Sequence, residues 1–384
     1  MIYFDNSATT HIYSEALETY QVVSNKYFGN PSSLHQLGES SSQLLTQSRN
    51  QIAEFFHVSS QEIFFTSGGT EGNNWAIKGT AFEKMTAGKH LITSAVEHPS
   101  VKKTFEQLEN MGFETTYLSV DNQGRVNLEE LAQSIRPDTS LVSIMAVNNE
   151  VGSVQPIEEI GKILQDYPQV HFHVDAVQVP GMVELDLSDN SRIDLATFSG
   201  HKFHGPRGIG FLYKNMNRRI QPLLTGGNQE KGQRSGTENV PAIAAMAKAL
   251  RIRFDDADQK VKNIADLRET LRCQVDRYEH VKVFSPIQGA PHILCFGIAG
   301  IRGEVLVHAL EEQDIYVSTT SACSSKKKTE SSTLSAMKVD SRLSESAIRV
   351  SLSETNTLEE VDSFIQAFDE IYTDFQAVFK SKGD

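Results

Sequence analysis

The sequence predicts an α/β fold, with a largely parallel sheet covered by helices and a smaller α+β domain after it. From about residue 60 to 215, short apolar runs alternate with segments whose apolar residues recur every three or four positions. A long helical stretch and a less regular series of strands and helices follow. The 384 residues are 39% hydrophobic and 22% charged, which suits one large domain and one smaller domain.

The predicted strands of the large domain are short and rich in β-branched and aromatic residues. They are 62–66, 90–96, 115–120, 141–147, 170–176 and 195–199. Segments with the spacing of amphipathic helices lie between them, at 70–85, 99–112 and 157–167. This alternation predicts crossover connections and therefore parallel strands. The first forty residues, rich in Gly, Asn, Pro and Ser, predict loops that pack back onto the large domain.

The second part of the chain begins with one predicted long helix, residues 239–279. It starts with Asn-Val-Pro, in which Asn is a good cap and Pro suits the first turn. We expect it to link a large domain, 1–250, to a small domain, 251–384. The small domain has predicted strands at 281–286, 292–298 and 347–353 and a helix at 304–313. Thr357 and Glu360 have capping-box spacing at the start of a last helix.

The net charge of -13 opposes a broad grip on nucleic acid or on anionic membranes. No window is apolar over the ~18 residues that a spanning helix requires, and the first residues do not have the pattern of a secretory signal. We therefore expect a cytoplasmic protein that binds neither membrane nor nucleic acid directly. No metal site is predicted.

The three cysteines cannot form a disulfide framework, and they fit a reducing compartment. Cys295 lies in a predicted buried strand and Cys273 in a helical stretch, so we interpret both as structural. Cys323 lies in the polar run STTSACSSKKK, where a thiol would be exposed and neighbouring cations would favour the thiolate. Taken alone, Cys323 is better interpreted as a chance surface cysteine.

Three polar clusters lie where predicted strands end, which is where open parallel sheets bind ligands. In TSGGTEGNN, free amides at a helix start could hold a phosphate together with Thr70, although such turns are often only structural. In HVDAVQ, Asp175 is a buried acid that needs a partner, such as a pyridinium nitrogen or a helix terminus. In SGHKFHGPRGIG, Lys202 could be desolvated, which lowers its pKa and suits a Schiff-base amine.

Together these clusters carry a resemblance to the cysteine desulfurases of the class V, fold-type I pyridoxal-phosphate family, over essentially the whole chain. The matching stretches follow the family's order: YFDNSATT, FGNPSSLH, FFTSGGTEGNN, EHPSV, NNEVGSVQPI, HVDAVQ, SGHKFHGPRGIG, GGNQEKGQRSGTENVP, SACSS and AIRVSLS. The loop of Cys323 resembles the subgroup with a long SAC-S loop and lacks the RxGHHC form. The resemblance implies a mostly parallel seven-stranded sheet and pyridoxal 5'-phosphate as the cofactor.

The resemblance also implies roles for single residues. Lys202 would form the Schiff base with the cofactor and then move protons, and Asp175 would pair with the pyridinium nitrogen. His98 would stack on the ring and act as acid or base, although a histidine before a proline could simply start a helix. The remaining implied contacts to the cofactor are Gln178 at the phenolic oxygen and Gly69, Thr70, Ser199 and His201 around the phosphate.

Two further sites follow from the resemblance. Asn149 and Arg349 would hold the substrate carboxylate, with Arg349 as a bidentate donor that fixes its plane; Asn149 would also border the cofactor. Thr237 would reach the phosphate of the neighbouring subunit, which implies a homodimer.

The implied reaction removes sulfur from L-cysteine, releases alanine and leaves a persulfide on Cys323 for an acceptor protein, such as a scaffold for iron–sulfur assembly or a tRNA-thiolation enzyme. The thiol must meet both cofactor and acceptor, so a flexible loop is required, and SSKKKTESST has the composition for one. Thr320 stands where the family often has glycine, which would stiffen this loop. Lysines 326–328 would steer an acidic acceptor or keep the loop solvated, and we favour solvation.

Other functions stay open at this point. A selenocysteine lyase or another class V reaction of the aminotransferase type is possible, but transamination requires no thiol. A non-catalytic scaffold for a sulfur-transfer partner is opposed by the joint presence of Lys202, Asp175, His98, Arg349 and Cys323. The destination of the sulfur is open among iron–sulfur assembly, tRNA thiolation and thiamine synthesis.

Overall fold

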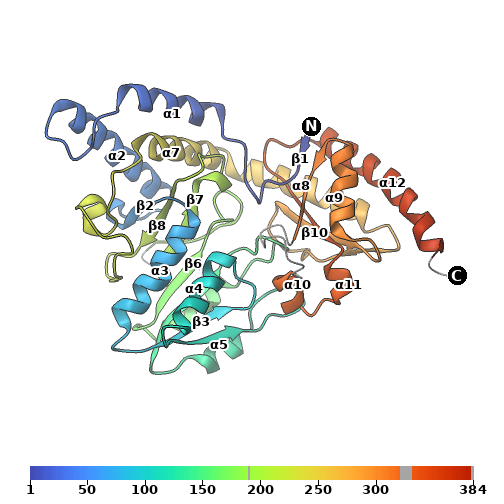
Figure 1. Cartoon of the computed structure of the whole chain (residues 1–384), viewed down its shortest axis with the longest axis horizontal. Coiled ribbons are helices and arrows are strands. Elements are labelled where there is room, and N and C mark those ends of the chain that lie inside the picture. The colour runs from blue at the N-terminus through green and yellow to red at the C-terminus, as the bar shows by residue number, and fades with distance from the viewer. Residues whose placement is uncertain (189–190, 321–330, 382–384) are drawn as a thin grey trace.

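A seven-stranded sheet forms the centre of the larger part of the computed structural model, which describes residues 1–188, 191–320 and 331–381 (Figure 1). Its strands are β2 (Ile63–Thr66), β3 (His90–Ser94), β4 (Glu114–Leu118), β5 (Thr139–Met145), β6 (His171–Asp175), β7 (Leu195–Ser199) and β8 (Gly210–Lys214). Their order is β2-β8-β7-β6-β5-β3-β4. Strand β8 is antiparallel to both of its neighbours, β2 and β7, and the other neighbouring strands pair in parallel. The predicted α/β fold with a mostly parallel sheet is confirmed, and all six predicted strands are present.

Strand β8 was missed because its five residues follow directly on a glycine-rich turn. It pairs antiparallel with β7, and Ser199 lies opposite Gly210. The segment between them therefore closes a hairpin and contains a single 3₁₀ turn, Gly200–Lys202. This hairpin holds Lys202 at the carboxyl end of β7.

Helices cover both faces of this sheet: α1 (Ser14–Lys26), α2 (Gln36–Phe55), α3 (Gly69–Lys84), α4 (Pro99–Glu109), α5 (Leu128–Ser134), α6 (Ile157–Leu164) and α7 (Val240–Phe254). The prediction of loops in the first forty residues is wrong, because α1 and the start of α2 lie there. Helix α1 has little apolar periodicity in its sequence, because only two of its side chains, Ala16 and Val23, are buried. The helix is stabilised by packing on α7, where Val23 meets Val240 and Ala244.

The predicted helix over 239–279 is two helices. Helix α7 ends at Phe254 and α8 (Ala257–Val275) begins after Asp256, whose φ of 49° places it in the left-handed region. A non-glycine residue in that conformation interrupts the helical hydrogen bonds. The predicted start is confirmed, because the Asn239 side chain accepts a bond of 3.2 Å from the amide of Ala242.

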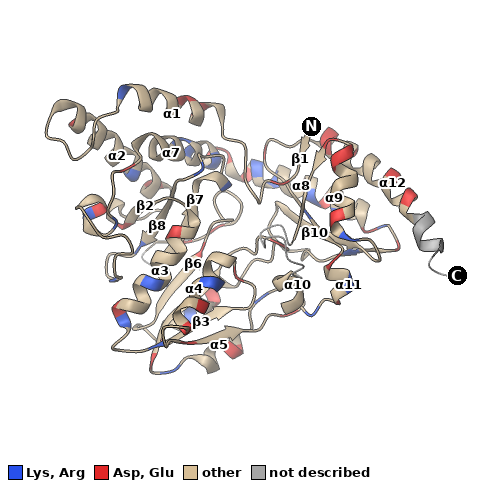
Figure 2. Ribbon diagram, viewed as in Figure 1, with Lys and Arg blue, Asp and Glu red and all other residues tan. Residues whose placement is uncertain are grey.

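The smaller part of the chain is built on a four-stranded antiparallel sheet in the order β12-β13-β10-β9. The strands and helices here are β9 (Val281–Val283), β10 (Ile293–Ile298), α9 (Gly303–Glu312), β12 (Ser318–Thr319), α10 (Ser332–Ala336), α11 (Ser341–Ser344), β13 (Ala347–Ser351) and α12 (Leu358–Ser381). The capping box of α12 is confirmed, with bonds of 3.1 and 3.3 Å between Thr357 and Glu360. Acidic residues, red in Figure 2, lie along α9 and α12.

The amino terminus belongs spatially to the smaller part. Strand β1 (Ile2–Tyr3) pairs in parallel with β11 (Ile315–Tyr316), and Phe4 is buried in the hydrophobic cluster of that part. The chain then crosses to the large sheet, so its first residues bridge the two parts (Figure 1). In the part of the chain that the structure describes, the helices are too short or too polar to span a membrane.

The starts of β6 and β7, the two strands that lead to the predicted site, are joined through Asp194. Its carboxylate is 6% exposed and accepts from the Phe172 amide at 2.8 Å, from Arg192 at 2.5 Å and from Arg218 at 2.7 Å. Removing a buried acid that pairs with two arginines leaves their charges uncompensated.

We expect Asp194→Ala to lower the free energy of unfolding by about 3 to 5 kcal/mol, measured by denaturant titration. Asp138→Ala is the matched control, because Asp138 pairs with Arg136 at an exposed position, where a pair contributes at most about 1 kcal/mol. Equal effects of the two substitutions would contradict this account of the buried cluster.

Candidate active site

A cavity of about 530 Å³ opens at the carboxyl ends of β5, β6 and β7. The structure brings together these predicted residues around it: Gly69, Thr70, His98, Asn149, Asp175, Gln178, Ser199, His201, Lys202 and Arg349. Thr237 does not line the cavity, and Cys323 and lysines 326–328 lie outside the described residues. The three clusters of Thr70, Asp175 and Lys202 therefore meet at one site, as their predicted positions at strand ends imply, and Arg349 joins them from the smaller part.

Asp175 is the last residue of β6 and is only 5% exposed. One carboxylate oxygen accepts a 2.7 Å bond from the Asn73 side chain, and the other accepts a 3.1 Å bond from the amide of Val177. Among the described residues, no lysine, arginine or histidine forms an ion pair with it. The buried carboxylate therefore lines the cavity with hydrogen bonds but no ion pair among the described residues, which suits a cationic ligand atom. The helix-cap alternative does not hold, since no helix starts here.

His98 belongs to a hydrogen-bonded chain that starts at Asp175. Asn73 donates also to Ser100 at 2.9 Å, and the Ser100 hydroxyl lies 2.8 Å from Nδ1 of His98. Nδ1 accepts the backbone amide of Ser100 at 3.1 Å, so in the neutral ring the proton sits on Nε2. Burial lowers the pKa of His98, the charge of Asp175 raises it and that of Lys202 lowers it. His98 thus caps α4, as the structural alternative expected, and also lines the cavity.

The start of α3 also lines the cavity, with a geometry that could hold an anion. Gly68 has a φ of 147°, and a Cβ on Gly69 would lie 2.8 Å from the side chain of Val177. Glycine therefore allows the helix start to approach Ser199 and leaves its amides open to the cavity, together with the hydroxyl of Thr70. Glu71 follows in the first turn, but its charge is paired with Arg234 at 2.8 Å.

The amine of Lys202 lies against the first segment of the chain. It donates to the backbone carbonyls of Ser7 and Ala8, at 2.5 and 3.0 Å. The neighbouring His201 contacts Thr9 at 3.3 Å, and burial with the charges of Lys202 and Arg207 lowers its pKa to about 4. His201 is therefore a neutral donor or acceptor near pH 7.

Arg349 reaches the cavity from β13 of the smaller part. Its guanidinium donates to the backbone carbonyl of Asn149 at 2.7 Å and to Asp5 at 2.9 Å. These two contacts fix the plane of the group, and Nε has no partner among the described residues. A side chain so held can present its remaining N–H groups to a carboxylate.

A sequence profile of the family described as Aminotransferase class-V matches residues 2–364. The chain belongs to the class-V aminotransferase family. A NifS/IcsS protein homolog of Lactobacillus delbrueckii subsp. bulgaricus is 57% identical to this class-V chain over 380 residues, which are 98% of this chain and 99% of the homolog. The cysteine desulfurase IscS of Methanosarcina thermophila is 41% identical over 96% of this chain and 91% of its own length.

Solved structures are also similar to this class-V chain. A NifS-like protein has a TM-score of 0.92 and 38% identity, with 97% of this chain and 99% of that chain covered. SspA, solved in complex with cysteine, has a TM-score of 0.83 and 32% identity, with 92% and 99% covered.

Sequence reasoning missed several residues of this class-V site. Asn73 lies in the glycine-rich motif TSGGTEGNN, and the sequence alone assigns it no role, although its side chain connects Asp175 to Ser100. The carbonyls of Ser7 and Ala8 are backbone atoms and leave no sequence signal of their own. Ser7 and Ala8 lie in the motif YFDNSATT, which matches the family. That match is the signal that could have placed this segment in the site.

The surroundings of His98 predict how it titrates in the protein without cofactor. Because burial dominates, its midpoint should lie below 6.5, and removal of a positive neighbour in Lys202→Ala should raise it. Asp175→Asn should lower it. Nuclear magnetic resonance of isotope-labelled histidine measures all three, with the exposed Lys103→Ala on the same helix as a control that leaves the midpoint unchanged. A wild-type midpoint above 6.5 would contradict the described environment.

Proposed function

We propose that this chain is a pyridoxal-phosphate-dependent cysteine desulfurase that converts L-cysteine to L-alanine and carries the sulfur as a persulfide on Cys323. The observation that carries the proposal is that the buried carboxylate of Asp175, the amine of Lys202 and the open start of α3 meet around one cavity. The relatives named cysteine desulfurase, which align over nearly the whole chain, support the same substrate.

The residues around the cavity fit pyridoxal phosphate. Its phosphate would be held by the start of α3 with Thr70 and Ser199, and its pyridinium by Asp175. Lys202 would hold its aldehyde carbon, with Gln178 near the phenolic oxygen and His98 over the ring. When bound, this cofactor withdraws electrons from the α-carbon of an attached amino acid.

The chain's own groups then have distinct tasks. Arg349 and Asn149 orient the substrate carboxylate, which fixes the plane of the amino acid relative to the ring. The amine of Lys202 would hold the cofactor, and it would also take and return a proton at the α-carbon of the substrate. The Nε2–H of His98 is the second proton donor on the cavity wall.

Cys323 is the proposed sulfur acceptor, because the other two thiols are unsuited to the task. Cys295 is buried in β10 and its pKa is raised strongly by burial, while a hydrogen bond to Glu269 raises the pKa of Cys273 on the surface of α8. Thiolates, not thiols, attack sulfur. The Cys323 thiolate would take the sulfur of substrate, so that an S–S bond forms and the C–S bond breaks. The electron pair of the broken C–S bond stays on the substrate carbon, which becomes the methyl group of alanine after protonation.

A homodimer is part of the proposal. Thr237 is exposed and lies three residues after Arg234, which is tied to Glu71 at the start of α3. Two large apolar side chains are exposed in the segment between α1 and α2: Phe28 is 70% exposed and Leu34 is fully exposed. Exposed apolar side chains of this kind favour a protein interface. A monomer in sedimentation experiments on the holoenzyme would contradict this part.

Three finer points complete the proposal. The chain divides near residue 250 into the larger and smaller parts. The loop of Cys323 is of the long SAC-S type. An acceptor protein in the cytoplasm receives the sulfur. Free thiols at Cys273 and Cys295 support a reducing compartment. Cell fractionation tests the location. Persulfide transfer from purified protein to candidate acceptors tests the last step.

The purified protein should show an absorbance band near about 410 nm that changes when L-cysteine is added. Lys202→Ala should abolish the band, and alanine formation should fall about a hundredfold or more. Cys323→Ser should keep the band but lose persulfide and turnover, because the cofactor site is intact and the sulfur acceptor is missing.

Cys273→Ser is the matched control and should behave as wild type. A coloured protein that ignores cysteine, or that forms alanine equally well without Cys323, would contradict the desulfurase proposal. It would favour another class-V reaction, whereas a colourless protein would favour a non-catalytic scaffold.

A further inference from the structure

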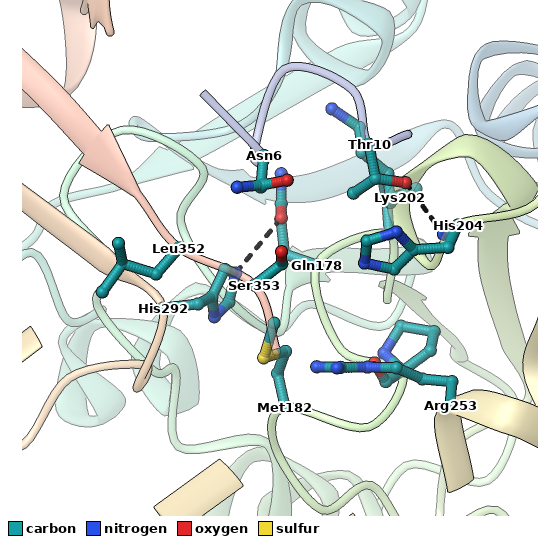
Figure 3. A pocket seen from close by; sticks show the side chains of 12 residues that line it. Asn6, Thr10, Gln178, Met182, Lys202, His204, Arg253, His292, Leu352 and Ser353 are labelled. Atoms are coloured by element: carbon teal, nitrogen blue, oxygen red, sulfur yellow. Dashed lines mark hydrogen bonds between the residues drawn. The ribbon is translucent and has the colours of Figure 1, made fainter. Parts of the chain in front are cut away.

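Behind the cavity, a buried histidine of the smaller part touches the amide of Gln178. Nε2 of His292 lies 3.3 Å from Oε1 of Gln178, and Nε2 of Gln178 donates to the backbone carbonyl of Ser7 at 3.1 Å. Figure 3 shows the two side chains pointing toward one another, beside Asn6 and Ser353. Gln178 lines the cavity, whereas His292 does not.

The chemistry of these contacts fixes the orientation of the amide and the tautomer of the histidine. The Ser7 carbonyl can only accept, so the NH₂ of Gln178 must face it and the amide oxygen must face His292. An amide oxygen also only accepts, so His292 must carry its proton on Nε2. Nδ1 is then an acceptor, and it has no partner among the described residues.

His292 stays neutral in this environment. It is 3% exposed, and the charged groups that act on it are all positive: Arg253, Arg268, Arg349 and Lys202. Burial and these charges lower its pKa to about 3, so the ring does not gain a second proton near neutral pH. Its backbone is fixed as well, since the His292 carbonyl accepts from the Leu352 amide at 2.9 Å.

We propose that His292 is a positioning residue that holds the Gln178 amide with one N–H on Ser7 and the other directed to the cofactor's phenolic oxygen. Without the His292 donor, the buried amide oxygen of Gln178 loses its partner and the amide is free to rotate. This inference rests on the proposed function, because it requires a cofactor whose phenolic oxygen lies at Gln178. The orientation of a cavity residue in the larger part is thus set by the smaller part.

The test is the pH dependence of the cofactor's absorbance band in the holoenzyme of His292→Leu. A donor to the phenolic oxygen stabilises the deprotonated form of the cofactor–lysine linkage, so its loss should raise the midpoint, by about half to one pH unit for one hydrogen bond. His292→Gln, which keeps a donor at similar reach, should restore most of the shift. Gln178→Leu should give the same shift, and the double variant no further shift.

A folded His292→Leu variant with the wild-type midpoint, alongside a shifted Gln178→Leu variant, would overturn the proposal and leave the proposed function intact. A wild-type protein without any cofactor band would instead overturn the proposed function. A measurement on wild type is independent of whether the variants fold. Isotope-labelled histidine should show His292 as the neutral Nε2–H tautomer from about pH 6 to 8, and an Nδ1–H tautomer would contradict the inference.

Discussion

The buried carboxylate of Asp175 is the constraint around which the site is arranged. A buried charge is costly unless a partner is supplied, and the described residues give it only one amide side chain and one backbone N–H. The sheet fixes its position, because β6 lies between β5 and β7 with Asp175 opposite Met145 and Thr197. A cationic ring nitrogen bound there would gain from an acid that folding has already desolvated.

The second property of the site is that no single part of the chain completes it. The strand ends supply Asp175 and Lys202, β13 supplies Arg349, and the amino-terminal segment lies between them with its carbonyls on the lysine amine. Strand β1 anchors that segment to the smaller part. The relative position of the two parts therefore determines both the distance between substrate carboxylate and cofactor and the surroundings of Lys202.

The sequence alone predicts the position of a functional residue where that residue lies in the same motif as a recognisable local structure. Asp175 and Lys202 directly follow apolar runs, so their place at strand ends could be predicted, and caps such as Thr357 with Glu360 are local patterns. What could not be predicted depends on distant packing: α1 is held by α7, and Gln178 meets His292 only after folding. The break at Asp256 is a backbone conformation that its residue type does not require.

The measurement that tests the central claim most directly is borohydride reduction of the purified protein followed by peptide mass mapping. Reduction makes a Schiff-base link permanent, so the account predicts one phosphopyridoxyl group per chain, on the peptide that contains Lys202. Asp175→Ala should lower the yield by weakening cofactor binding. Modification of a different lysine, or none in freshly prepared wild-type protein supplied with pyridoxal phosphate, would contradict the account.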